Sequence, residues 1–177
     1  LTHVAFSVNR EDAETLVRRN IYKKEKIRYL PMGIDLDKFN PDSFSSEFIQ
    51  AKKKEIGIPS SSKVIGIVAR LVKEKGYFEL FEAFAKIVKQ FPDAVLLVVG
   101  PAEPQKSDRF SYAAVKNFGI QNSVKFLGER TDIVELYALM DIFVLPTYRE
   151  GLGISILEAS AMKKPVVATA IRGCREA

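Results

Sequence analysis

Short runs of apolar, largely β-branched residues recur along this chain, and stretches with the apolar spacing of amphipathic helices separate them. The runs lie at 63–69, 94–99, 123–127, 142–145 and 165–169. Runs without polar alternation are typical of strands buried on both faces of a parallel sheet. Because strands that alternate with helices through short loops give right-handed crossovers, the sequence predicts an α/β fold with a Rossmann-like, doubly wound parallel sheet.

Helices are predicted around these strands, at 10–19, 45–56, 77–91, 108–118 and 131–140. The phenylalanines of the third helix recur at helical spacing and are expected to face the core, namely Phe78, Phe81, Phe84 and Phe91. Gly119 is a candidate C-cap for the fourth helix. Thr131 or Asp132 is expected to cap the N-terminus of the fifth.

The segment Glu150-Gly-Leu-Gly-Ile-Ser-Ile-Leu-Glu158 leads from a predicted strand into another helix. Its glycines let a ligand approach the backbone where the free amides of a helix N-terminus favour a phosphate-sized anion. Glu150 would repel that anion unless it faces neutral hydroxyls, and Glu158 lies about 12 Å further along the axis. The pair is suited to two separate polyhydroxylated groups. The alternative is that Glu150 is an ordinary first-turn acid and Glu158 a solvated one.

The strand predicted at 63–69 delivers Arg70 to its carboxyl end, and Lys73 and Lys75 follow before the next helix. In an open α/β sheet this edge faces the binding crevice, and a guanidinium with an ammonium suits a diphosphate. A solvated basic loop is the alternative. The location at the sheet edge favours binding.

Composition indicates a globular domain with an appendage, because 177 residues with 47% apolar and 28% charged side chains can bury a core. The chain has no run of eighteen apolar residues and no signal-peptide pattern, so a cytoplasmic location is expected. Its single cysteine, Cys174, excludes an internal disulfide, and its single histidine, His3, lies far away in the sequence. We expect no metal and no cofactor.

The net charge of +5 raises the question of an anionic partner, and basic residues cluster at 18–19, 23–26 and 52–54. Nucleic acid is not expected, because the phenylalanines read as a core stripe and not as a base-stacking platform. An anionic membrane surface at its cytoplasmic face is the better candidate, and solvated lysines are the alternative.

Several segments match the motifs of one enzyme family in the same order. They are Ala69-Arg-Leu71 with Glu74-Lys-Gly76, Val98-Val-Gly100, Val124-Lys-Phe-Leu-Gly128, Leu136-Tyr137, Pro146-Thr-Tyr-Arg-Glu-Gly-Leu-Gly153, Leu157-Glu-Ala159, Pro165-Val-Val-Ala168 and Gly173-Cys-Arg-Glu176. The set resembles the retaining, nucleotide-sugar-dependent glycosyltransferases of family four (glycosyl transferases group 1), of the type that assembles bacterial polysaccharides and glycans. Met32 stands where this family commonly has Asn, Thr147 where it has Ser, and Lys163 where it has Gly or Met.

This resemblance implies the C-terminal half of a GT-B fold. Residues 1–42 would be the end of an N-terminal acceptor domain with the interdomain linker. Residues 43–177 would be the nucleotide-sugar donor domain, cut before its last strand and closing helices. The chain alone is expected to bind nucleotide without transferring sugar.

The resemblance also implies roles for individual residues, in metal-independent chemistry. Arg70, Lys75 and Glu150 would be catalytic, with the two cations neutralising the donor diphosphate and Glu150 binding a sugar hydroxyl near an oxocarbenium-like centre. Glu158 would bind the ribose, and the nucleobase would lie at the loop that carries Arg130. The remaining donor-binding residues would act through their amides, namely Gly151, Leu152, Gly153 and Ile154.

The implied donor is a UDP-N-acetylhexosamine, and the implied acceptor is a glycan or lipid-linked sugar bound by the N-terminal domain. Two other functions remain open. A UDP-sugar epimerase of GT-B fold usually needs acid and base side chains in the cleft, including His, which this segment almost lacks. A non-catalytic nucleotide-binding or scaffold module would not need the intact Arg70, Lys75, Glu150 and Glu158.

Overall fold

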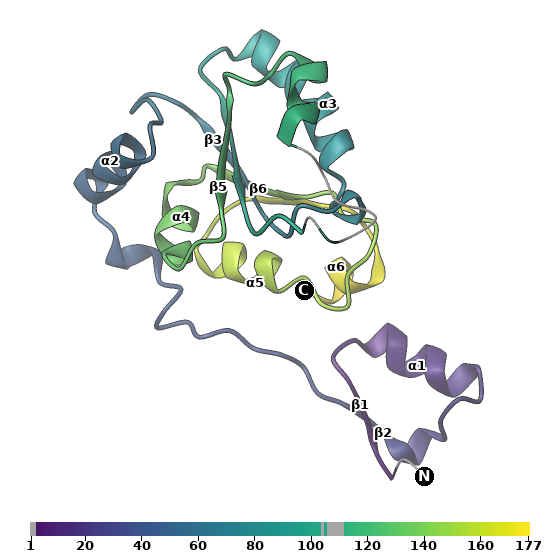
Figure 1. Cartoon of the computed structure of the whole chain (residues 1–177). Coiled ribbons are helices and arrows are strands. Elements are labelled where there is room, and N and C mark those ends of the chain that lie inside the picture. The colour runs from purple at the N-terminus through teal and green to yellow at the C-terminus, as the bar shows by residue number, and fades with distance from the viewer. Residues whose placement is uncertain (1–2, 104, 106–111) are drawn as a thin grey trace.

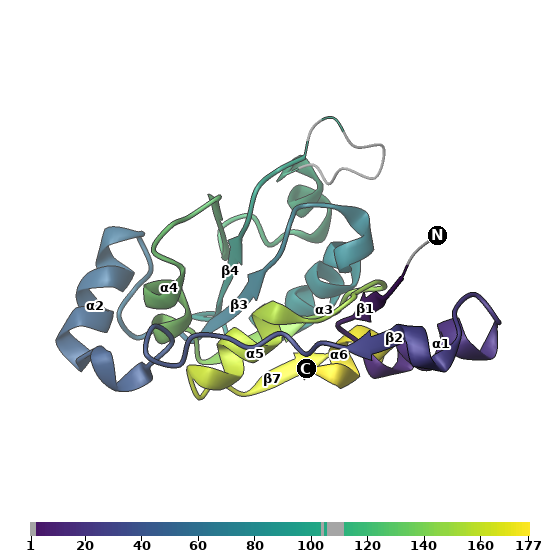
Figure 2. The same ribbon diagram turned by 90° about the horizontal axis from the view of Figure 1, so that it is seen from below.

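A computed structural model describes residues 3–103, 105 and 112–177, which form a small N-terminal unit, an extended connection and a larger α/β unit (Figure 1). The N-terminal unit contains strand β1 (Ala5–Ser7), helix α1 (Arg10–Arg18), the 3-10 helix η1 (Lys24–Lys26) and strand β2 (Ile27–Tyr29). Its two strands pair in parallel. Seen from below, this unit lies beside helix α6 (Arg172–Glu176) of the larger unit (Figure 2).

The larger unit is built on a five-stranded, fully parallel sheet in the order β5-β4-β3-β6-β7. Its strands are β3 (Val64–Val68), β4 (Val95–Val99), β5 (Val124–Gly128), β6 (Ile142–Leu145) and β7 (Val166–Ala168). The chain runs outward from β3 to β5 and then returns to the other side of β3, which confirms the predicted doubly wound sheet. This reversal puts a crevice at the carboxyl ends of β3 and β6, where ligands bind in open α/β sheets.

Helices cover both faces of this sheet (Figure 1). The helix α3 (Tyr77–Gln90) and the 3-10 helix η4 (Tyr112–Phe118) lie on one face, and α4 (Ile133–Leu139) and α5 (Ile154–Ala161) lie on the other. Outside this layer, α2 (Ser46–Glu55) packs against α4, after the 3-10 turn η2 (Pro41–Ser43). None of the helices in the described part of the chain is long and apolar enough to cross a bilayer.

The core lies on both faces of the sheet, and the predicted phenylalanine stripe of α3 is only partly correct. Every residue of β4 is buried, as are Phe81 and Phe84 of α3. Phe78, however, is 41% exposed and Phe91 is 62% exposed. Phe78 directly follows the buried Tyr77, so the helix turns it toward the edge of the core, where its ring meets Phe118. Phe91 lies beyond the last helical residue.

Two predicted helix ends can be compared with the structure. The first residues of the predicted helix 108–118, at 108–111, lie outside the described residues, and residues 112–118 form η4. Gly119 follows this element with a φ of 69°, as expected of a glycine that ends a helix. After α5, Lys163 has a φ of 55°, so a lysine occupies a turn conformation that favours glycine.

Candidate functional site

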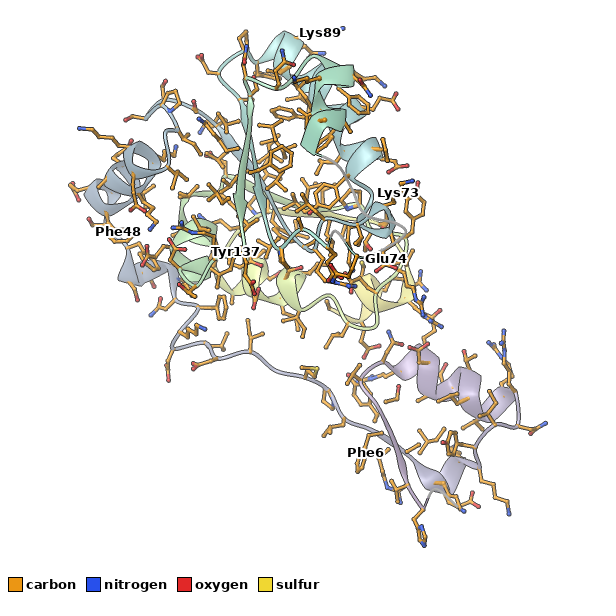
Figure 3. All side chains as sticks on the ribbon, viewed as in Figure 1. Phe6, Phe48, Lys73, Glu74, Lys89 and Tyr137 are labelled. Carbon is orange, nitrogen blue, oxygen red and sulfur yellow. The ribbon has the colours of Figure 1, made fainter. Side chains whose placement is uncertain are left out.

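Residues from three separate segments meet at the carboxyl edge of β3 and β6. Arg70 follows β3, Lys75 ends the 3-10 helix η3 (Lys73–Lys75), and Glu150 belongs to the loop between β6 and α5. With Glu74, Arg149 and Gly151 they line an open cavity of about 360 Å³. The structure therefore brings together four of the residues that the sequence predicts as donor-binding. Figure 3 shows Glu74 at this end of the sheet.

Lys75 and Glu150 form a short ion pair in the wall of this cavity. Lys75 Nζ lies 2.6 Å from Glu150 Oε1, and the two side chains are only 9% and 17% exposed. Lys75 also donates a hydrogen bond of 3.3 Å to the carbonyl of Arg149. The pairing neutralises the carboxylate that the sequence suggested would repel a phosphate.

The close approach of these segments depends on Gly76. This residue has a φ of 75°, and a Cβ on it would lie 2.0 Å from the Pro146 carbonyl oxygen. Any side chain at this position would push η3 away from the loop after β6. The glycine of the Lys75-Gly76 pair thus places the lysine against Glu150.

Arg70 is held over the same cavity by two carboxylates that the sequence reasoning missed. Its guanidinium lies 3.2 Å from Glu74 and 3.1 Å from Glu103, with the Arg70 side chain 40% exposed. The two residues are four positions apart, but Arg70 lies before η3, so the rule for helical pairs does not predict this contact. Glu103 comes from the loop after β4, and no local pattern indicates its contact. Because Arg has five N–H donors, donors remain for an incoming anion.

The amides predicted to bind phosphate are in two different states. The Gly153 amide donates to the Gly173 carbonyl at 3.0 Å, and the Ile154 amide donates to Leu152 at 2.9 Å. Within the described residues, the Gly151 and Leu152 amides have no hydrogen-bond acceptor. Gly173 permits this packing, since a Cβ there would lie 2.3 Å from the Glu150 carbonyl oxygen. Gly151 and Leu152 are therefore the amides free for an anion in this structure.

Glu158 lies on α5 and does not line this cavity. It contacts the buried Tyr137, which is labelled in Figure 3. The Tyr137 hydroxyl donates a hydrogen bond of 2.8 Å to Glu158 Oε2. Burial raises the pKa of the Glu158 carboxyl above its ordinary value, while this hydrogen bond and the charge of Lys38 oppose the rise. Burial and the nearby carboxylate likewise raise the pKa of Tyr137. Tyr137 thus holds one Glu158 oxygen in place.

Arg130 takes part in a partly buried charge cluster beside the carboxyl end of β5. It forms two hydrogen bonds with Asp132, of 2.7 and 2.6 Å. Asp132 also contacts Lys52 at 2.6 Å, and the hydrogen bonds from Arg130, assisted by Lys52, hold its pKa well below the ordinary value. Asp132 is the N-cap residue of α4, but its side chain makes no capping hydrogen bond because it is engaged in these pairs.

The basic cluster at 52–54 is not the surface patch that the sequence suggested. Lys52 and Lys53 are 8% and 7% exposed. Lys53 donates a hydrogen bond of 2.9 Å to the Ser62 carbonyl, and Lys52 pairs with the carboxylates of Glu55, Asp132 and Glu135. Only Lys54 of this run is exposed, so the expectation was wrong for two of its three lysines.

Comparisons with known proteins identify the family to which this fold belongs. The family model for glycosyl transferases group 1 matches residues 48–177. A D-inositol 3-phosphate glycosyltransferase of Corynebacterium jeikeium is 36% identical over 83% of this chain and 36% of its own length. An N,N'-diacetylbacillosaminyl-diphospho-undecaprenol alpha-1,3-N-acetylgalactosaminyltransferase of Campylobacter jejuni is 37% identical over 99% of this chain and 44% of its own length.

Among solved structures, Anabaena HepE in complex with UDP-glucose superposes with a TM-score of 0.84 at 25% identity, over 98% of this chain and 46% of that one. The fold thus defines one half of a GT-B glycosyltransferase. The chain belongs to the glycosyl transferases group 1 family, the retaining enzymes of family four, and corresponds to their C-terminal, nucleotide-sugar-binding domain. It spans less than half the length of the relatives described above.

Proposed function

We propose that this chain is the donor-binding domain of an enzyme that transfers an N-acetylhexosamine from UDP to a glycan or lipid-linked acceptor, with retention of configuration. The observation that carries the proposal is the meeting of Arg70, the Lys75–Glu150 pair and the free Gly151 and Leu152 amides around one cavity at the sheet edge. UDP is favoured because Anabaena HepE was crystallised with UDP-glucose. An N-acetylhexosamine is favoured because the Campylobacter relative is an N-acetylgalactosaminyltransferase.

In this proposal different residues bind different parts of the donor. Arg70 and the remaining N–H donor of Lys75 bind the diphosphate and stabilise the charge that grows on the leaving nucleoside diphosphate. Glu150, oriented by Lys75, accepts a hydrogen bond from a hydroxyl of the transferred sugar. Glu158 accepts one from the ribose, and the loop at Arg130 receives the base. The Gly153 and Ile154 amides would bind the diphosphate only if their present hydrogen bonds, to Gly173 and Leu152, were broken.

The same proposal assigns the two parts of the chain to two domains. Residues 1–42 belong to the end of an acceptor domain and the linker, and residues 43–177 belong to the donor domain. The acceptor would then be bound outside this chain, which alone would bind nucleotide and transfer no sugar. Exposed basic residues of the N-terminal unit, Arg18, Arg19, Lys23 and Lys24, offer contact to an anionic membrane at its cytoplasmic face.

Titration calorimetry of the 177-residue chain with UDP, GDP and ADP tests the donor claim. UDP should bind at least about tenfold more tightly than the other two, a difference of about 1.4 kcal/mol. Equal affinities, or no binding of any nucleotide, would overturn the proposal. Transfer from UDP-N-acetylhexosamine by the complete protein, with release of UDP, separates a transferase from an epimerase and from a scaffold.

A further inference from the structure

Asn9 in the N-terminal unit is a fully buried polar residue in contact with the loop of the candidate site. It is 0% exposed, and it precedes α1 as its N-cap. Its side-chain oxygen accepts a hydrogen bond of 3.0 Å from the Asp12 amide. Its side-chain nitrogen donates a hydrogen bond of 3.2 Å to the carbonyl of Gly151. One side chain therefore caps a helix and binds a loop 142 positions away in the sequence.

The backbone of Asn9 is also fixed. The Ser7 hydroxyl donates to the Asn9 carbonyl at 2.7 Å and accepts from the Asn9 amide at 3.3 Å. The Asn9 carbonyl accepts a further bond of 3.1 Å from Ala13 at the start of α1. Because its backbone and side chain are both engaged, the asparagine presents its N–H group to Gly151 in one orientation.

Polar and charged side chains around Asn9 also connect the two units. Asp12 pairs with Arg172 at 2.6 Å, Glu11 pairs with Arg175 at 2.7 Å, and Tyr29 donates a bond of 2.7 Å to Glu176. All three partners are on α6, which faces the N-terminal unit (Figure 2). The two ion pairs are substantially exposed, so each contributes little energy and is screened by salt. The Asn9 bond differs because its donor side chain is fully buried.

We propose that Asn9 is a positioning residue for the donor loop and sets the affinity for the donor. This inference rests on the proposed function, because it assumes that the loop binds the donor diphosphate. Asn9 holds the Gly151 carbonyl, while the Glu150 carbonyl packs against Gly173. Each carbonyl shares a trans peptide with one free amide, Glu150 with Gly151 and Gly151 with Leu152, and a trans peptide places its N–H opposite its C=O. The two contacts therefore set the directions of the free Gly151 and Leu152 amides. Donor binding is thereby coupled to the N-terminal unit.

The substitution Asn9→Ser separates this role from helix capping. Serine remains a good N-cap for α1 but is too short to reach the Gly151 carbonyl. Asn40→Ser is the matched control, because Asn40 also caps a helix, through a bond of 3.0 Å to the Asp42 amide, and is remote from the donor loop. Both variants should unfold at nearly the same temperature as the parent chain.

Two measurements on the 177-residue chain test the proposal. Hydrogen exchange of the Gly153 amide, which is bonded to Gly173, should be about tenfold faster in Asn9→Ser and unchanged in Asn40→Ser. UDP affinity, by calorimetry, should fall about fivefold to tenfold in Asn9→Ser alone, and in the complete protein the donor KM should rise more than kcat falls. Unchanged loop exchange with unchanged UDP affinity overturns the proposal. A parent chain that binds no UDP overturns the proposed function instead, and unchanged loop exchange would then still overturn the role of Asn9.

Discussion

Two lysines of this molecule, Lys52 and Lys75, are equally buried and lie equally close to a carboxylate, yet their surroundings differ. Each side chain is 9% exposed, and each has a carboxylate oxygen at 2.6 Å. Lys52 contacts three carboxylates, of Asp132, Glu135 and Glu55, the last two at 2.8 and 3.2 Å. Each of its three N–H donors therefore has an anionic acceptor.

Lys75 contacts one carboxylate and one backbone carbonyl, which leaves an N–H donor for a ligand in the cavity that it lines. Burial lowers the pKa of Lys52, but its three carboxylates outweigh this effect and raise the pKa above the ordinary value. Burial alone thus does not distinguish a structural lysine from one that is proposed to bind the donor. The number of acceptors already bound to the ammonium does.

The largest effect on stability is expected from replacing Lys52, whose three N–H donors all have carboxylate acceptors. Lys52→Met leaves Asp132 and Glu135 close together without their shared cation, so the free energy of unfolding should fall by about 3 kcal/mol in urea denaturation. UDP affinity should not change. Because the pKa of Asp132 is lowered in the native state, its contribution is present above its unfolded value, and the loss should shrink below about pH 4.

Lys54→Met is the control for this variant, since Lys54 lies on the same helix and is exposed. It should change the unfolding free energy by less than about 0.5 kcal/mol. If Lys52→Met weakened UDP binding while leaving stability intact, the contrast between the two lysines would be reversed.

The corresponding change at the cavity should act mainly on binding. Lys75→Met removes the free N–H donor, so UDP affinity should fall about 30-fold, or about 2 kcal/mol, by calorimetry. It also leaves Glu150 buried without a cation, which should cost about 1–2 kcal/mol of stability. The double variant Lys75→Met/Glu150→Gln should regain stability without regaining affinity.

Lys73→Met is the matched control, because Lys73 lies in the same 3-10 helix but is exposed. Its UDP affinity should stay within about twofold of the parent. Restored affinity in the double variant would show that Glu150, and not Lys75, controls binding.

Local sequence patterns predicted the sheet and brought the candidate residues to one edge of it, but they did not predict which side chains pair there. The run at 63–69 forms β3 and delivers Arg70 to the edge of the sheet, because strand identity and direction follow from hydrophobic pattern and crossover rules. Lys52 and Lys54 could not be told apart, since helix α2 has a weak apolar stripe and its burial depends on α4. Glu103 and Asn9 reach the site from distant segments, where no spacing rule applies.

The smallest effect is expected at Glu158, where function and stability should change in opposite directions. Glu158→Gln keeps an acceptor for the Tyr137 hydroxyl but removes the charge proposed to bind the ribose, so UDP affinity should fall about fivefold. Calorimetry checks this, with the exposed Glu14→Gln as control. Unchanged affinity would argue against the ribose role.

Stability should move the other way because burial raises the pKa of Glu158 in the native state. A carboxyl with a raised native pKa favours folding when protonated, and this advantage is lost as the pH rises through the native value. Glutamine mimics the protonated form at every pH, so Glu158→Gln should melt about 1–3 °C higher at pH 7, with no difference below about pH 4. A melting temperature lowered at pH 7 would mean that the Glu158 carboxylate is stabilised by its surroundings, as that of Asp132 is. The contrast between the Lys52 cluster and the candidate donor site would then not extend to Glu158.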